Sequence, residues 1–206
     1  MSRQAEPRGF LNYCWGTLAS PVKTFTKLLD DPHKLKFGFI VCLMLGILYS
    51  IGVLVAYLNG VPPVVKPILP IPVESYYLWQ ACFTVPVSLI AFVVFAGLGQ
   101  LIARPFKGGG SFSGNFAVLS FGYTVPSLVL FWLPEMVMFS IGTNLSDASA
   151  PIVALNIARQ IIAFTWAGIL CTWGMKLSQR LSLTKAILVT IAALIPLLGI
   201  FLTFIR

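Results

Sequence analysis

Five long apolar segments dominate the pattern of hydrophobic and polar positions along the chain. A helix that crosses a membrane needs about 20 mainly apolar residues, and each of the five is close to that length. They cover residues 37–58, 76–103, 116–141, 157–175 and 186–205. We therefore predict an all-α polytopic membrane domain over residues 37–206, with residues 1–36 as a separate segment before it.

The composition agrees with a chain that is mostly surrounded by lipid. Of its 206 residues, 58% are hydrophobic and 10% are charged, whereas a soluble domain carries about 25% charged residues. The formal net charge of +8 would suit nucleic acid in a soluble protein. In a polytopic membrane protein, basic residues gather in the loops that stay in the cytoplasm, so we expect no nucleic-acid partner.

Most basic residues fall on one side of the predicted spans. Eleven of the 14 Lys and Arg residues lie before the first span, between the second and third, or between the fourth and fifth. They are Arg3, Arg8, Lys23, Lys27, Lys34, Lys36, Arg104, Lys107, Lys176, Arg180 and Lys185. The other side has Lys66, Arg159 and Arg206. This asymmetry predicts a cytoplasmic N-terminus and a C-terminus outside.

The segment before the first span has apolar residues at helical spacing, in two runs that Pro21 separates. Trp15 belongs to the first run, Phe25 and Leu28 belong to the second, and Pro32 follows. Together with nearby lysines, this pattern indicates two short amphipathic helices. They would lie on the anionic inner leaflet or bind a partner protein, because the same pattern serves both purposes.

The third span contains two prolines, Pro126 and Pro134, in an otherwise apolar stretch. A proline inside a helix leaves the carbonyl one turn earlier without its donor, which here means Gly122 and Leu130. In lipid those carbonyls need other partners. We expect a bent third helix, whose bend either lets Gly122 approach a neighbouring helix closely or opens a cavity.

Glu135 follows Pro134 directly, and Arg159 stands at the start of the next predicted span. An ionisable side chain inside a membrane indicates a functional site unless a partner explains it. We predict that Glu135 lies near the outer interface and that Arg159 is in the first turn of its span. Three interpretations stay open: an ion pair that stabilises the fold, a site for protons or substrate, or simple exposure of the carboxylate.

A cavity beside the bent helix would need further polar residues. The candidates are Tyr123 in the third span and Gln80 and Gln100 in the second, together with the two prolines and Glu135. If they line one cavity, the protein is a small carrier or a lipid-handling protein. Otherwise a non-enzymatic adaptor that organises membrane or partner proteins fits better, and the absence of an obvious inverted repeat favours this adaptor.

The loop RPFKGGGSFSGNF, residues 104–116, is rich in glycine and has basic neighbours. It lacks the GxxxxGK[ST] order of a phosphate-binding loop. We predict a flexible connector capped by Ser113 or Asn115, with contact to lipid phosphates as an additional role.

Groups for catalysis or metal binding are scarce in the sequence. His33 is the only histidine, and the four cysteines form no CxxC motif. Multi-histidine zinc sites and Ser-His or Cys-His pairs therefore cannot be assembled around a core site. Paired intramembrane carboxylates are missing too. We expect no enzyme, no metal and no cofactor.

Several short motifs occur in an order typical of one family. A P…F..L…P pattern precedes the first span, a Gly-rich loop precedes the third, Gly-Tyr and then Pro occur within the third, and Ser-x-x-Lys-Ala opens the last. The residues are Pro21, Phe25, Leu28 or Leu29, and Pro32; Gly108–Gly110; Gly122, Tyr123 and Pro126; and Ser182, Lys185 and Ala186. In these features, over residues 10–205, the chain resembles the Yip domain family, the Ypt/Rab-interacting membrane proteins and their bacterial relatives.

The resemblance implies a five-span helical membrane protein without catalytic residues. Eukaryotic members act in vesicle trafficking by engaging small GTPases and one another. The acidic N-terminal motif and the long cytosolic tail of those members are missing here, so GTPase binding is not transferred to this chain. The short basic form is similar to bacterial members, which implies the inner membrane. The implied partners are membrane lipids, a second copy of the chain or another membrane protein.

Overall fold

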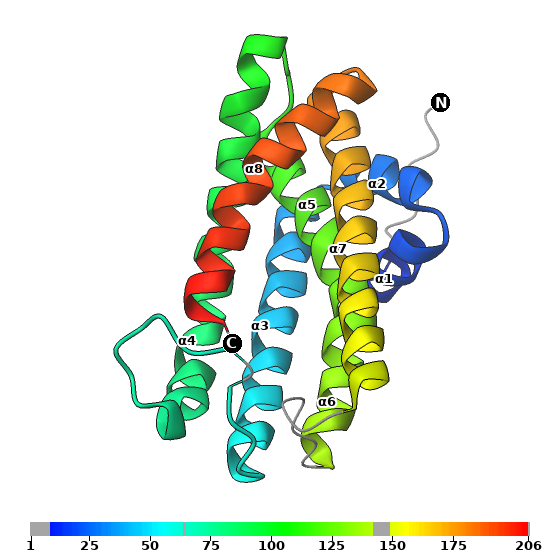
Figure 1. Ribbon diagram of the computed structural model, residues 1–206. Helices are drawn as coiled ribbons and strands as arrows, with labels where there is room; N and C mark the ends of the chain where they lie inside the picture. The colour runs from blue at the N-terminus through cyan, green and yellow to red at the C-terminus, as the bar shows by residue number, and fades with distance from the viewer. Residues whose placement is uncertain (1–8, 64, 142–148, 206) are drawn as a thin grey trace.

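The computed structural model describes residues 9–63, 65–141 and 149–205, which are almost entirely helical. Most of the long helices run side by side in one bundle (Figure 1). In chain order the elements are α1 (Phe10–Ala19), α2 (Pro21–Asp30), α3 (Lys34–Leu58), η1 (Val73–Ser75), α4 (Tyr76–Ala103), η2 (Arg104–Phe106), α5 (Phe112–Ser127), η3 (Leu128–Trp132), α6 (Leu133–Ser140), α7 (Ala150–Gln179) and α8 (Leu183–Phe204). Of these, η1 and η2 are 3₁₀ turns and η3 is a π-helix.

Five helical stretches are long and apolar enough to cross a membrane, which confirms the all-α polytopic fold. The α-helix of the second span begins at Tyr76 and ends at Ala103, as the hydropathy pattern predicts. The third begins four residues earlier than predicted, because the Ser111 hydroxyl caps it by accepting the Gly114 N–H at 3.2 Å. The fourth begins seven residues earlier, with Pro151 in its first turn, where proline is well tolerated.

The centre of the bundle is α5, whose residues from Gly114 to Ser127 are all buried. Helices α1, α2, α3, α4 and α7 all pack around it. A Cβ atom built on Gly122 would lie 3.2 Å from backbone atoms of both Leu170 and Cys171 in α7. The backbones of α5 and α7 therefore meet at this glycine, which is the close packing that the small residue permits.

A buried polar link joins three of the spans near one end of the bundle. Asn115 in α5 is fully buried, and its Nδ2 donates to the Ala96 carbonyl of α4 at 2.8 Å. Its Oδ1 accepts from the Ser178 hydroxyl of α7 at 2.9 Å. Asn115 and Ser113 are thus inside the helix rather than at its cap, which corrects the sequence-based expectation.

Helices α1 and α2 pack against the bundle instead of projecting from it. Phe25 and Leu28 are fully buried and belong to the main core. Between the two helices and the first span, the Tyr13 hydroxyl donates to Asp31 Oδ2 at 2.8 Å. The prediction that Phe25 and Leu28 face a leaflet or a partner is therefore wrong. These two side chains pack into the core and hold α2 against the bundle.

The other predicted residues of this segment stay accessible. Trp15 is 73% exposed, and Leu11 is exposed on the same helix. Pro21 begins α2 at a position where proline suits a helix, and Pro32 lies in the exposed turn that follows. The exposed face of α1 therefore carries two of the apolar side chains that the sequence pattern identifies.

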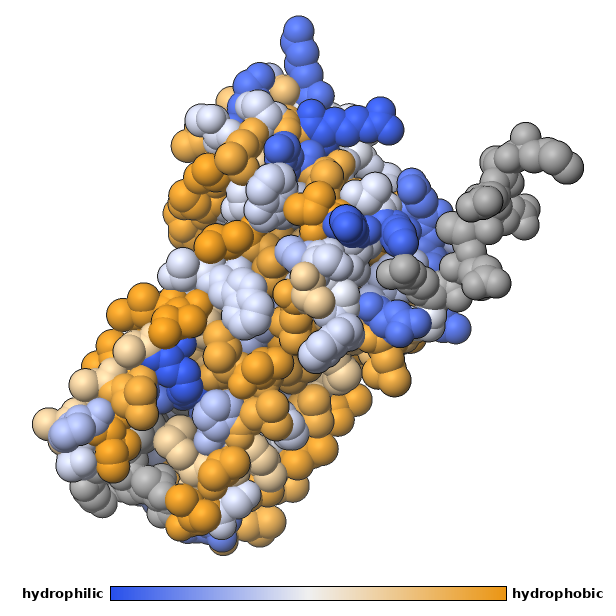
Figure 2. Space-filling model, turned by 90° about the vertical axis from the view of Figure 1, so that its right-hand side faces the viewer, coloured by the Kyte–Doolittle hydropathy of each residue, from blue (hydrophilic) through white to orange (hydrophobic). Residues whose placement is uncertain are grey.

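Hydrophilic residues gather at one end of the molecule, and apolar side chains cover most of the flank that Figure 2 shows. We call this end the basic end and define it by α2, η2, residues 107–111 and residues 180–182. All eleven cations of the majority side except Arg3 and Arg8 lie in or near these elements. Arg3, Arg8 and Arg206 fall outside the described residues.

The Gly-rich loop at the basic end is packed tightly against α7. The N–H of Gly109 donates to the Gln179 carbonyl at 3.3 Å, and the N–H of Gly110 donates to Gln179 Oε1 at 3.2 Å. A Cβ atom on Gly110 would lie 2.0 Å from the Ser178 carbonyl oxygen, whereas one on Gly109 would meet nothing within 4 Å. The prediction of a flexible connector is therefore wrong.

This packing makes a matched pair of variants informative. Gly110→Ala should lower the free energy of unfolding by about 1–3 kcal/mol, since the loop must move away from α7 to admit a methyl group. Gly109→Ala should leave stability nearly unchanged, because its side of the loop is open. Thermal unfolding of the two purified variants measures the difference, and equal melting temperatures would contradict the tight packing.

Candidate functional site

The third span is broken into three pieces beyond its middle. Helix α5 holds Pro126 near its end, the π-helix η3 follows, and α6 has Pro134 as its second residue. A π turn inserts a residue into the helical ladder and leaves carbonyls poorly paired, and such turns are frequent at functional sites. The two prolines therefore produce a local rearrangement of the backbone, and the carbonyls it releases need donors from elsewhere.

Arg159 of α7 supplies those donors. Its Nη1 donates to the carbonyls of Leu130 and Phe131, the second at 3.2 Å, and its Nη2 donates to Asn156 Oδ1. The guanidinium carbon lies 5.7 Å from the centre of the Phe131 ring. Leu130 carries the carbonyl that Pro134 frees, so Arg159 supplies the donor that this carbonyl lost.

Glu135 completes a cluster with this arginine and with Tyr49 of α3. Glu135 Oε1 lies 3.6 Å from Arg159 Nη2, and Glu135 Oε2 accepts from the Tyr49 hydroxyl at 3.3 Å. The side chains of Arg159 and Glu135 are only 15% and 21% exposed. Three helices, α3, α6 and α7, are thereby joined through one carboxylate.

Arg159 lies farther from the start of its helix than the sequence suggests. Arg159 is the tenth residue of α7 and not part of its first turn, which places it about 14 Å along the helix axis. The first-turn prediction for Arg159 is wrong because α7 extends back to Ala150, through residues that the hydropathy pattern left to a loop.

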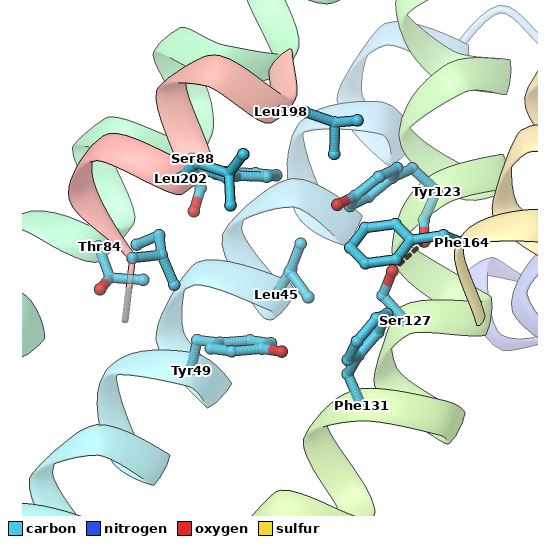
Figure 3. Close-up of a pocket in the computed structure, with 12 residues that line it drawn as sticks. Leu45, Tyr49, Thr84, Ser88, Tyr123, Ser127, Phe131, Phe164, Leu198 and Leu202 are labelled. Atoms are coloured by element: carbon cyan, nitrogen blue, oxygen red, sulfur yellow. Dashed lines mark hydrogen bonds between the residues drawn. The ribbon is translucent and has the colours of Figure 1, made fainter. Parts of the chain in front are cut away.

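A cavity of about 180 Å³ lies next to this cluster and shares Tyr49 with it; Figure 3 shows the residues that line the cavity. Its walls combine hydroxyl-bearing side chains of α3, α4 and α5 with apolar side chains of the bundle. The residues that line it are Leu45, Tyr49, Thr84, Ser88, Tyr123, Ser127, Phe131, Phe164, Leu198, Phe201, Leu202 and Ile205. We call it the lateral cavity.

Two of the hydroxyl groups that line the lateral cavity are bonded to their own helices and do not face the cavity. Thr84 and Ser127 donate to backbone carbonyls of their own helices, at 2.6 and 2.7 Å, and Tyr49 donates to Glu135. The hydroxyls of Tyr123 and Ser88 point toward the central space in Figure 3. They can bind a carbonyl or hydroxyl group of a molecule that is otherwise apolar.

The mouth of the lateral cavity lies on the apolar flank of the bundle. Helices α7 and α8 meet at the basic end and diverge toward the other end (Figure 1). Phe164 of α7 and Leu202 of α8 line the cavity, yet they are 44% and 64% exposed. Side chains that belong both to the cavity wall and to the apolar surface mark an opening between these two helices.

Most residues predicted for a cavity lie elsewhere. Tyr123 lines the lateral cavity, whereas Pro126, Pro134 and Glu135 do not, although Glu135 reaches it through Tyr49. Gln80 is buried in α4, with its carbonyl accepting from Thr84. Gln100 donates to the Gly110 carbonyl at 3.3 Å, at the basic end. The prediction of one cavity lined by both glutamines is therefore wrong.

The sequence analysis missed the residues that make the cavity polar. Tyr49 stands in a span without a charged residue, and Ser88 and Ser127 look like ordinary small residues of apolar helices. A tyrosine far from both ends of its span was the one available signal, since tyrosines usually lie at membrane interfaces. Within the described residues, no three His, Cys, Asp or Glu side chains gather so as to hold a metal ion.

The fold and this site define a polytopic helical membrane protein with a broken central span and a cavity on its flank. The chain belongs to the Yip1 domain family, whose sequence model matches residues 15–205. No curated protein matches the chain. No solved structure matches it either. Family membership thus rests on nearly the whole chain, and the site is described from this structure alone.

The interactions of Arg159 predict that its loss destabilises the protein more than the loss of the Glu135 charge does. Arg159→Met should destabilise the protein by about 3 kcal/mol, because it leaves Glu135 without an opposite charge and two backbone carbonyls without their donor. Glu135→Gln should cost less, since the amide still accepts from Tyr49 and the arginine keeps its carbonyl partners. Melting temperatures in one detergent rank the two variants.

Arg104→Met is the control for loss of a cation, because Arg104 is exposed at the basic end. If Glu135→Gln lowered the melting temperature more than Arg159→Met does, the main role of Arg159 would be its ion pair with Glu135. Its hydrogen bonds to the backbone carbonyls would then contribute less to stability.

Proposed function

We propose that this Yip1-family protein is a non-enzymatic, lipid-handling membrane protein. In this proposal, the lateral cavity takes up part of an apolar molecule directly from the bilayer. The observation that carries the proposal is the mouth between α7 and α8, which lies on the apolar flank and leads to the hydroxyls of Tyr123 and Ser88, which point into the cavity. The sequence allowed either a small carrier or a lipid-handling protein, and this site favours a lipid-like molecule as the ligand.

The chemistry of the walls supports this narrowing. Most lining residues are apolar, and desolvating an ion or a sugar there would be costly. The guanidinium of Arg159 is already bonded to carbonyls and lies beside Glu135, so it offers no uncompensated charge to a substrate. The volume of about 180 Å³ is below the roughly 300–1,000 Å³ of drug-sized pockets, which suits one chain or one end of a lipid.

A second candidate function, that of a membrane adaptor, is supported by α1. Leu11 and Trp15 form an exposed apolar face, while the Tyr13–Asp31 hydrogen bond ties the same helix to the turn that follows α2. A rigidly held apolar face of this kind suits a membrane protein partner, a second copy of the chain or the leaflet surface. Both functions can reside in one molecule, since the two features share no residue.

The proposed orientation follows from the charge asymmetry. The basic end would face the cytoplasm of a bacterial cell, with the protein in the inner membrane and the C-terminus outside. The packing of α1 and α2 beside that end supports this arrangement, because the N-terminal segment and the basic loops then lie on the same side.

The cavity proposal predicts opposite results for two neighbouring positions on α8. Leu198→Trp fills the lateral cavity and should remove a bound lipid, whereas Ile195→Trp changes a lipid-facing position that is 67% exposed and should retain it. Native mass spectrometry of gently extracted protein counts the lipid molecules that remain bound. Wild-type protein without a bound lipid, or equal retention in the two variants, would overturn the proposal.

The adaptor candidate has its own test. Leu11→Gln combined with Trp15→Gln should abolish a stoichiometric protein partner or a defined oligomer, without changing the melting temperature, because both side chains are exposed. The same mass spectra of the gently extracted protein show the partner. A partner that survives this double change would assign the interface to another surface.

A further inference from the structure

A second cavity, of about 320 Å³, lies at the basic end of the bundle. It is enclosed by the end of α2, the Gly-rich loop and the end of α7, and it shares no residue with the lateral cavity. Its polar lining consists of Thr26, Asp30, Lys34, Ser111, Ser178 and Arg180. We call it the basic pocket.

Hydrogen bonds fix the side chain of Lys34 and the backbone of Arg180 at the basic pocket. Lys34 Nζ donates to the Leu29 carbonyl at 2.5 Å, at the end of α2. Arg180 follows the last residue of α7 in a left-handed conformation, with φ of 55°, and its N–H donates to the Lys176 carbonyl. The two side chains therefore approach the pocket from different helices, α3 and α7.

Only part of the positive charge of the basic pocket is offset by carboxylates among the described residues. The only ion pair among the described residues joins Glu135 and Arg159, so neither Lys34 nor Arg180 has a described carboxylate within 4 Å. Asp30 also lines the pocket, which leaves two cations and one carboxylate. The net charge of the lining is thus positive, on an end of the molecule that is itself rich in Lys and Arg.

The start of a helix adds to this positive charge. The pocket reaches Ser111, the cap of the long central helix α5, and a helix N-terminus favours an anion. Directly behind Gly110, the side chain of Gln179 is buried, and its Nε2 has no hydrogen-bond partner. Gln179 does not line the pocket, and the N–H groups of Gly109 and Gly110 already donate to it, so these groups are not available to a ligand.

We propose that the basic pocket binds a phosphate group. A lysine, an arginine and a helix N-terminus converge there, and phosphate offers several acceptor oxygens to such a mixed set of donors. The headgroup of an anionic phospholipid and a soluble phosphate compound share this chemistry. The proposal does not depend on the lateral cavity or on the adaptor function, and it differs from a Walker-type loop because no strand precedes the glycines.

The test measures binding to the full-length protein in a neutral detergent by isothermal titration calorimetry. The probes are inorganic phosphate, dioctanoyl phosphatidylglycerol and, as a lipid without phosphate, dioctanoylglycerol. Arg180→Gln and Lys34→Gln should each weaken phosphate or phosphatidylglycerol binding about tenfold. Asp30→Asn should strengthen it, since it removes the opposing charge.

Lys23→Gln is the matched control, because Lys23 is exposed on α2 and does not line the pocket. It should leave the affinity unchanged. Binding of phosphatidylglycerol alone would assign the pocket to a lipid headgroup, while binding of inorganic phosphate would assign it to a phosphate group free in solution, and either supports the site.

Three outcomes would overturn the proposal: no binding of either phosphate probe, equal binding of dioctanoylglycerol, or an equal loss in Lys23→Gln and Arg180→Gln. The last would indicate a diffuse surface charge instead of a site. If Arg180→Gln fails to fold, Lys34→Gln and Asp30→Asn decide the question, because their effects have opposite signs.

Discussion

The bundle depends on one constraint, which is that backbone carbonyls released inside lipid must find donors. The third span passes through the centre of the molecule, and Pro134, just after η3, leaves the Leu130 carbonyl without its helical donor. The guanidinium of Arg159 donates to this carbonyl and to that of Phe131 from a neighbouring helix. Glu135 lies beside that cation, and Tyr49 donates to Glu135 in turn, so α3, α6 and α7 are positioned by a single backbone requirement.

The lateral cavity is a consequence of the same arrangement. Because η3 and Arg159 hold the far half of α7 against the broken span, α7 stays on that side while α8 follows α4. The C-terminal end of α8 is attached to α4 by the Tyr76 hydroxyl, which donates to the Phe204 carbonyl at 3.0 Å. The two helices therefore diverge, and side chains of Leu198 and Phe164 border the space between them.

The sequence predicts the architecture well, because the length and hydropathy of a span are local properties of the chain. Five spans, the bent third helix and the family follow from the sequence alone. The partners of particular side chains do not, because they depend on helix rotation. Phe25 and Leu28 show this, since an amphipathic pattern is the same whether the apolar face meets a leaflet or a bundle. Gln100 shows it too, since its side chain donates to the Gly110 carbonyl and does not line the lateral cavity.

The position of the cavity mouth has a consequence for ligand exchange. A molecule that enters between α7 and α8 moves within the plane of the bilayer and never has to cross water. Its occupancy is then set by its mole fraction among the surrounding lipids, which is far higher than any aqueous concentration that a sparingly soluble molecule can reach. A site with weak intrinsic affinity would remain filled under these conditions, and it would respond to changes in membrane composition.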